Sequence, residues 1–174
     1  MVILINIIGF NIVWFGLVYF GNNFTPIALL YFSAHFVFFA KNNGEPKYLL
    51  LIALIGILTD SFLHYVNVFI FLPNEHIPLW LACLWLCFST TLYHSLRFLG
   101  KSIWFQLLAG FVAPFSYFAG NQLGAVTFGN SSLITYIVLA ITWSSLFVLF
   151  FSLKKHFQSI DINNQTSLRG NPHV

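Results

Sequence analysis

The sequence predicts an all-α, polytopic membrane protein built as a bundle of six transmembrane helices. Of its 174 residues, 59% are hydrophobic and only 6% are charged, whereas a soluble domain averages about 25% charged residues. The apolar residues also gather into six long segments, and a helix needs about 20 mostly apolar residues to cross a bilayer. We therefore expect residues 1–155 to form one transmembrane domain. Residues 156–174 are expected to form a polar, disordered cytoplasmic tail.

Short turns rich in Asn, Gly or Pro separate these segments. The six expected spans are residues 3–20, 24–40, 48–72, 77–96, 103–120 and 132–153. Asn22 and Asn23 leave room only for a tight hairpin between the first two spans. Pro26 suits the first turn of the second span, where a missing N–H costs nothing. Pro114 should kink the fifth span in its middle.

All Lys and Arg residues fall on one side of the membrane when six spans are threaded. They are residues 41, 47, 97, 101, 154, 155 and 169. Lys and Arg concentrate in cytoplasmic loops, so the sequence predicts that both termini are cytoplasmic. We expect the first span to be retained, because it lacks the basic start and the cleavage site of a signal peptide.

Polar side chains inside the apolar segments form two matched rows with spacing i, i+4, i+7, which places each row on one helix face. The rows are Asp60, His64 and Asn67 on the third span, and Thr90, His94 and Arg97 on the fourth. His35, on the second span, is expected at the same depth as His94, and Asp60 close to mid-membrane. Together these residues could line a polar cleft that opens to the cytoplasm near Arg97 and serves as a ligand site or proton path. Ionisable residues within a membrane mark function by default.

Each of these residues also has a structural interpretation. Asp60 and His64 could simply pair with each other and fix one helix. Arg97 could be a topology anchor with its charge at the interface, and Thr90 could bond to helix backbone or to a neighbouring helix. His35 and His94 could be hydrated or packing residues near the interface.

Several function classes lack their signatures. The sequence contains no zinc-protease motif, nucleophile elbow or Walker loop, so no catalytic residue is assigned and whether the protein is an enzyme stays undecided. Basic patches are absent, which argues against nucleic acid as a partner. No cofactor is indicated, and nothing in the spacing of His35, His94 and Asp60 argues for a metal.

Four stretches resemble elements of one known family. Residues 53–61 resemble its G-x-x-x-D-S element, and residues 78–95 its P-x-W…W-x-x-F-x-T-T-x-x-H-S element. Residues 114–125 and 6–14 are similar to two further elements. The family is a bacterial inner-membrane family known as domain of unknown function 2878. The resemblance implies a small integral protein of the bacterial inner membrane, and it supplies no activity, substrate or site residue.

Three functions agree with these features. The first is a transport or binding subunit that takes a small solute, a proton or a membrane lipid into the polar cleft. The second is a membrane-embedded enzyme that acts on lipid, with Asp60 and a His as acid and base. The third is a structural subunit of a homo- or hetero-oligomeric membrane complex. A weaker likeness, in size and span count only, is to the small-molecule-binding subunits of energy-coupling vitamin transporters.

Overall fold

The computed structural model describes the backbone of residues 2–39, 44–71 and 76–169, and the side chains of these residues from Ile3 to Ser159. The fold is all-α, as predicted. Its helices are α1 (Val2–Phe20), α2 (Thr25–Phe38), α3 (Glu45–Tyr65), α4 (Leu79–Tyr93), α5 (Ile103–Val112), α6 (Pro114–Gln122) and α7 (Ser132–Arg169). Two 3₁₀ turns, η1 (Gly21–Phe24) and η2 (Arg97–Lys101), and two short strands, β1 (Phe69–Ile70) and β2 (Thr127–Phe128), complete the described elements.

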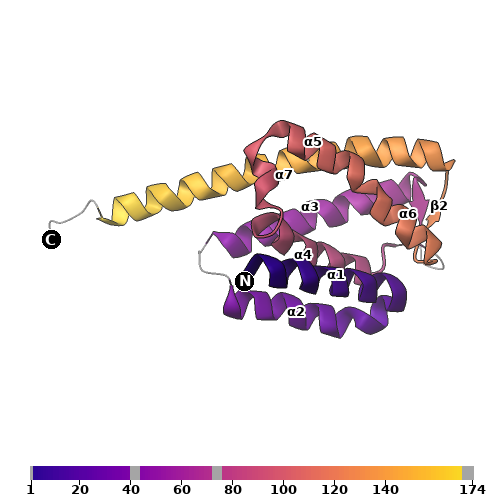
Figure 1. Ribbon diagram of the computed structural model, residues 1–174, viewed down its shortest axis with the longest axis horizontal. Helices are drawn as coiled ribbons and strands as arrows, with labels where there is room; N and C mark the ends of the chain where they lie inside the picture. Colours follow the sequence, from indigo (N-terminus) through magenta and orange to yellow (C-terminus); the bar gives the residue numbers. More distant parts are fainter. Residues whose placement is uncertain (1, 40–43, 72–75, 170–174) are drawn as a thin grey trace.

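Four helical stretches of the described chain are long and apolar enough to cross a membrane. They are Ile3–Phe38, Glu45–Tyr65, Ile103–Gln122 and Ser132–Ser159. The first stretch reverses direction at η1, so α1 and α2 lie side by side as the expected hairpin (Figure 1). Helices α2 and α4 have 14 and 15 residues, or about 21–23 Å at 1.5 Å per residue, shorter than the bilayer core of about 30 Å. Helix length therefore supports a multi-pass membrane protein without establishing six spans.

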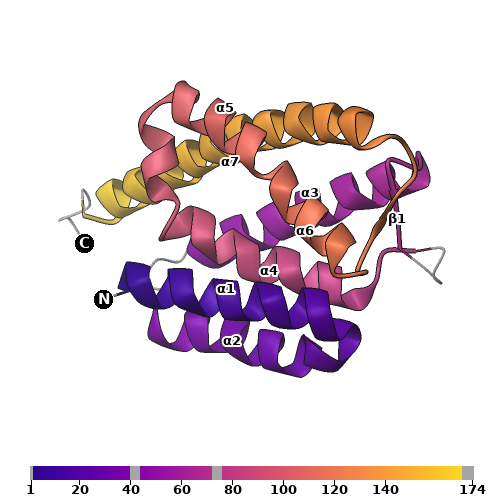
Figure 2. The same ribbon diagram turned by 45° about the vertical axis from the view of Figure 1, so that its right-hand side comes forward.

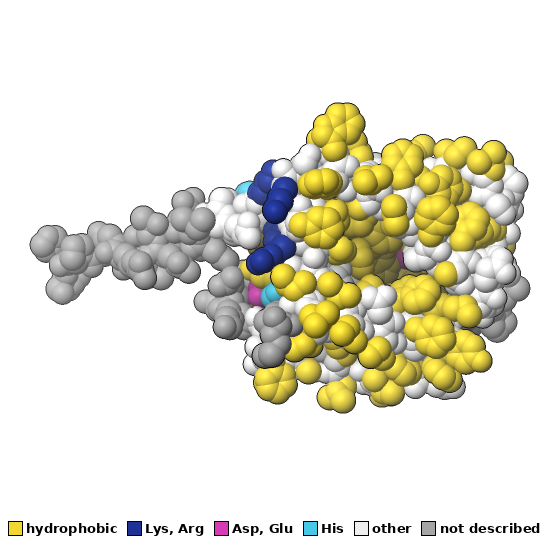
Figure 3. All heavy atoms as spheres, viewed as in Figure 1, with side chains coloured by type: hydrophobic (Ala, Val, Ile, Leu, Met, Phe, Trp, Pro, Cys, Tyr) yellow, Lys and Arg dark blue, Asp and Glu magenta, His cyan; other side chains and the backbone are white. Residues whose placement is uncertain are grey.

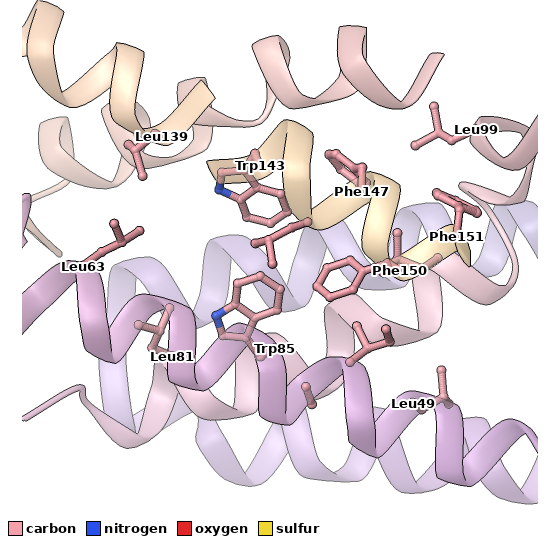
Figure 4. Close-up of a cluster of buried hydrophobic side chains, with 14 of the residues drawn as sticks. Leu49, Leu63, Leu81, Trp85, Leu99, Leu139, Trp143, Phe147, Phe150 and Phe151 are labelled. Atoms are coloured by element: carbon pink, nitrogen blue, oxygen red, sulfur yellow. The ribbon is translucent and has the colours of Figure 1, made fainter. Parts of the chain in front are cut away.

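The helices form three layers. The α1–α2 hairpin packs on α4, which packs on α3, and α5, α6 and α7 lie on the other side of α3 and α4 (Figure 2). The core between these layers is aromatic: Trp85 from α4 and Trp143 from α7 stack with ring centroids 5.2 Å apart, beside Phe147 and Phe150 (Figure 4). Large apolar side chains cover the outer surface (Figure 3), which suits contact with lipid.

The third expected span ends earlier than the sequence predicted. Helix α3 stops at Tyr65, and Asn67 adopts the left-handed conformation with φ of 57°, which Asn tolerates better than most residues. The following residues form β1, which pairs with β2 in an antiparallel arrangement. Asn67 therefore does not lie on the helix face of Asp60, and the expected row on the third span is wrong at this position. Asp60 lies about 22 Å from the start of α3 and about 8 Å from its end, rather than at its middle.

The structure also shows where the fifth segment is kinked and where the fourth and sixth segments end. The predicted kink at Pro114 is confirmed, because Ala113 separates α5 from α6. Helix α4 ends at Tyr93, so Arg97 lies in η2 and not on the α4 face of Thr90. Helix α7 continues to Arg169, through most of the segment for which we expected disorder. No Gly or Pro interrupts residues 156–169, so nothing in the chain stops the helix there.

Candidate functional site

A large cavity lies between the α1–α2 hairpin and the α5–α6 pair. Its volume is about 610 Å³, within the range of small-molecule sites. Its walls come from α1, α3, α4, η2, α5, α6 and α7, and they are almost entirely apolar. Figure 3 shows a hollow in the apolar surface with an acidic side chain at its base, and Asp60 is the acidic residue of the cavity wall.

The cavity is elongated and open on its side. Phe98 and Leu99, in η2, line one end, and Phe71 and Val126, next to the two strands, line the other. The walls include side chains that are largely exposed on the membrane-facing surface: Leu108 is 62% exposed and Phe115 is 60% exposed. The opening therefore lies on the apolar outer surface, in contrast to the expected polar cleft that opens at Arg97.

Asp60 lies at the floor of this cavity and is held by two aromatic donors. Only 1% of its surface is exposed. Trp85 donates its indole N–H to Oδ2 at 2.7 Å, and Tyr117 donates its hydroxyl to Oδ1 at 2.8 Å. A Cβ at Gly56 would overlap the Trp85 indole, so this glycine is what lets the ring reach the face of α3 that carries Asp60. As expected, Asp60 faces other helices and not lipid.

His64 does not pair with Asp60. Its Nδ1 lies 3.2 Å from the carbonyl oxygen of Phe69 in β1, and its ring lies against Phe71. The two side chains share a helix face, but Trp85 and Tyr117 occupy the carboxylate of Asp60. The interpretation of an Asp–His pair is therefore wrong. Sequence spacing alone could not reveal the two aromatic partners, which are 25 and 57 residues away.

A second polar cluster lies at the opposite end of α3. Nε2 of His35 and Nε2 of His94 lie 3.0 Å and 3.1 Å from the same oxygen, Oε1 of Glu45. The ring centroids of the two histidines are 4.9 Å apart, which confirms that they lie at similar depth. His35 and Glu45 are buried, and His94 is partly exposed.

Glu45 is the member of this cluster that the sequence analysis missed. Glu45 falls between the expected spans 24–40 and 48–72, whereas in the structure it begins α3 and is only 2% exposed. A signal was present: Pro46 follows it, and proline is favoured in the first turn of a helix, where an acidic residue also interacts well with the helix dipole.

Beside this cluster, four polar residues connect α1, α2 and the end of α4. The Asn6 amide donates to Thr90 at 3.0 Å and to the hydroxyl of Tyr31 at 3.2 Å, and it accepts from Ser95 at 2.6 Å. Thr90 also donates to the Cys87 carbonyl at 2.8 Å. Thr90 thus bonds to its own helix and to a neighbouring helix, which is the structural interpretation of this residue.

The candidate residues therefore lie in separate places. Asp60 is in the lateral cavity; His35 and His94 are with Glu45; Thr90 is in the network beside them. His64 and Asn67 lie next to the two strands, where the Asn67 carbonyl accepts from Asn130 at 3.1 Å. Arg97 is exposed at the start of η2. The structure does not bring these residues together in one cleft.

The basic residues mark the end of the molecule that holds Glu45. Lys47 lies in the first turn of α3, Arg97 and Lys101 lie in η2, and Lys154 donates to the carbonyls of Leu92 and Tyr93 at the end of α4. Figure 3 shows the Lys and Arg side chains gathered in a band beside an acidic and a His side chain. We call this the basic end.

Comparison with known proteins identifies a family and nothing more specific. A family model described as a protein of unknown function (DUF2878) matches residues 3–149, which is most of the chain. No curated protein and no solved structure matches the chain.

Proposed function

The chain belongs to this family of unknown function, and we propose that it binds one amphipathic, lipid-soluble molecule in the lateral cavity. The apolar part of that molecule lies along the groove, and a hydrogen-bond donor of its polar part reaches Asp60. One observation carries this proposal: a cavity of about 610 Å³ opens toward the membrane-facing surface and contains a buried carboxylate.

The chemistry of the walls favours a lipid over a water-soluble solute. Besides the tryptophan rings, the polar groups in the described walls are Asp60, Ser116 and Tyr117. A solute with many polar groups would lose its hydration and find few partners there, and each unpaired polar group costs about 1–3 kcal/mol. An acyl chain that enters directly from the bilayer has no hydration to lose and needs no polar partners, because the walls are as apolar as the surrounding lipid tails.

Asp60 supplies the polar contact because its donors leave part of the carboxylate unused. A carboxylate has about four lone-pair sites, and Trp85 and Tyr117 occupy one on each oxygen. A hydroxyl or amine of the bound molecule can use a remaining site. An acid–base enzyme has less support, because His64 is turned to the Phe69 carbonyl and not to Asp60.

We infer further that the chain crosses the bacterial inner membrane six times, with the basic end in the cytoplasm. The crossings are α1, α2, α3, α4, the α5–α6 pair and α7. The start of α1 and the second half of α7 lie at the same end of the bundle (Figure 1), which fits an even number of crossings. The positive-inside rule gives the orientation. Reporter fusions at Asn22 and Gly129 should both show the periplasmic side, and a cytoplasmic signal at either would contradict this topology.

Tryptophan fluorescence offers a direct test of lipid entry. Four of the five tryptophans line the cavity, namely Trp14, Trp80, Trp85 and Trp143. Replacing Trp14, Trp80 and Trp104 by Phe leaves the two that are buried from the outer surface. This variant is placed in nanodiscs whose lipids carry bromine on their acyl chains. Bromine quenches tryptophan only at short range, so quenching of Trp85 and Trp143 requires a chain inside the cavity.

A pair of matched variants decides the result. Ala113 lines the cavity, so Ala113→Phe should fill the groove and restore the fluorescence. Ile141 is exposed on α7 and does not line the cavity, so Ile141→Phe should leave the quenching unchanged. Absence of quenching, or equal quenching in both variants, would contradict lipid binding.

A further inference from the structure

We propose that His35, Glu45 and His94 form a binding site for a divalent transition-metal ion, with Zn²⁺ as the preferred ion. The site is separate from the lateral cavity, whose wall includes none of these three residues. It joins α2, the first turn of α3 and the end of α4 at the basic end of the molecule.

The three donor atoms already converge. Nε2 of His35 and Nε2 of His94 lie 3.0 Å and 3.1 Å from Glu45 Oε1, and all three donor atoms lie within 4.8 Å of one another. Tetrahedral Zn²⁺ has bonds of about 2.0–2.2 Å to such donors, which places neighbouring ligand atoms about 3.3 Å apart. The two distances to Glu45 Oε1 are within a few tenths of an ångström of this value, and one ion can bind all three side chains when the two imidazole nitrogens take a similar separation.

The donor types select the class of ion. Imidazole nitrogen suits zinc, copper, iron and nickel, whereas magnesium and calcium take oxygen ligands. Two imidazoles and one carboxylate are also a known three-ligand set for zinc, in which the fourth position stays open for water or another ligand. The side chains of His35 and Glu45 are 3% and 1% exposed, and that of His94 is 17% exposed, so the fourth position is reached on the His94 side.

Burial of the carboxylate also favours a cation. Taking an ionised carboxylate out of water is costly unless it is paired or coordinates a metal. The nearby Lys154 amine donates to the carbonyls of Leu92 and Tyr93 and lies over the Tyr93 ring, and no ion pair of Glu45 with it is formed among the described residues. The described ion-pair partners of Glu45 are the two imidazoles, and these are the side chains that bind Zn²⁺.

Metal binding is tested on the untagged full chain in detergent, stripped with a chelator and then titrated with Co²⁺ and Zn²⁺. Tetrahedral Co²⁺ absorbs visible light strongly, and Zn²⁺ should displace it. We expect one Co²⁺ per chain and at least a tenfold weaker affinity in Glu45→Gln and His94→Ala. His64 lies at the other end of α3, so His64→Ala is the matched control and should bind as the wild type does.

The wild-type titration keeps the test decisive if a variant fails to fold. A tetrahedral spectrum at one ion per chain, reversed by Zn²⁺, supports the site. Absence of that spectrum in the folded wild type, or unchanged affinity in folded Glu45→Gln and His94→Ala, would overturn it. In that case, the cluster is only a carboxylate that accepts two imidazole hydrogen bonds.

Discussion

Helix α3 buries two carboxylates, Asp60 and Glu45, and it satisfies them in different ways. Asp60 accepts one hydrogen bond on each oxygen, from a tryptophan and a tyrosine that are packed into the core. Glu45 presents a single oxygen to two imidazoles. Indole and phenol groups donate in their ordinary states, whereas an imidazole nitrogen can exchange its proton for a metal ion. The same helix therefore carries one carboxylate with fixed donors and one with exchangeable donors.

The two carboxylates also lie in different surroundings. Asp60 lies at the floor of a cavity that opens on the apolar outer surface, and its indole donor is held in place by the stack of Trp85 on Trp143. Glu45 lies where three helices meet at the basic end. The comparison indicates that rigid neutral donors suit recognition of a lipid, and that converging imidazoles suit an ion.

The largest effect on stability is expected from a substitution that removes both acceptor oxygens of Asp60. In Asp60→Leu, the buried Trp85 N–H and the Tyr117 hydroxyl would have no acceptor, at a cost of about 1–3 kcal/mol for each group. We expect a loss of about 2–5 kcal/mol in the free energy of unfolding, measured by denaturation in detergent or mixed micelles. Leu58→Ala, at an exposed site on the same helix, keeps the outer surface apolar and is the control for a substitution on α3. A loss below about 1 kcal/mol would show that the two donors find other partners.

A smaller effect on stability should depend on metal, and it distinguishes Glu45 from Asp60. If the ion binds only the folded chain, a concentration of 100 times Kd stabilises the fold by about 2.7 kcal/mol. Zn²⁺ should therefore raise the melting temperature of the wild type and of Asp60→Asn, but not that of Glu45→Gln. Equal shifts in all three proteins would show that zinc acts elsewhere, and the contrast between the two carboxylates would fail.

The contact of Gly56 with Trp85 gives the next prediction. A methyl group at Gly56 would overlap the middle of the Trp85 ring, and overpacking of a core costs about 1–3 kcal/mol. Gly56→Ala should therefore destabilise the fold and move the indole away from Asp60, which can be followed by the Trp85 emission in a variant without the other tryptophans. At Gly120, an added methyl group meets its neighbours no closer than 3.5 Å, so Gly120→Ala should be neutral.

Local signals in the sequence account for much of the fold. Apolar length and turn residues predicted α1, α2 and the start of α4, and Pro114 predicted the break between α5 and α6. The end of α3 was missed because residues 66–71 are as apolar as the helix before them. Their strand depends on β2, which is more than 50 residues away. Length alone cannot distinguish a long helix from a shorter helix followed by a buried strand.

The sequence could predict which candidate residues lie together only where their depth along the helices determines it. His35 and His94 come together because they lie at the C-terminal ends of α2 and α4, which both run toward the basic end, and depth can be counted from the sequence. The partners of Asp60 depend on which faces of α4 and α6 pack against α3, and no local pattern encodes that choice. The lateral cavity depends on the spacing of whole helices and had no signal in the sequence.

The smallest effect comes from removing one donor and leaving the carboxylate. Tyr117→Phe deletes the hydroxyl that bonds to Asp60 Oδ1 at 2.8 Å and keeps the ring in its place beside Phe69 and Trp143. Asp60 retains the Trp85 bond, so we expect a loss of only about 0.5–1.5 kcal/mol in unfolding free energy. The same variant should change lipid binding by more than it changes stability, because the freed oxygen becomes available to the bound molecule. Nanodiscs with brominated lipid should therefore show altered quenching of Trp85 and Trp143 in a chain that still melts close to the wild-type temperature. If quenching is unchanged, the Tyr117 hydroxyl does not compete with the lipid for Asp60, and its role is confined to joining α3 and α6.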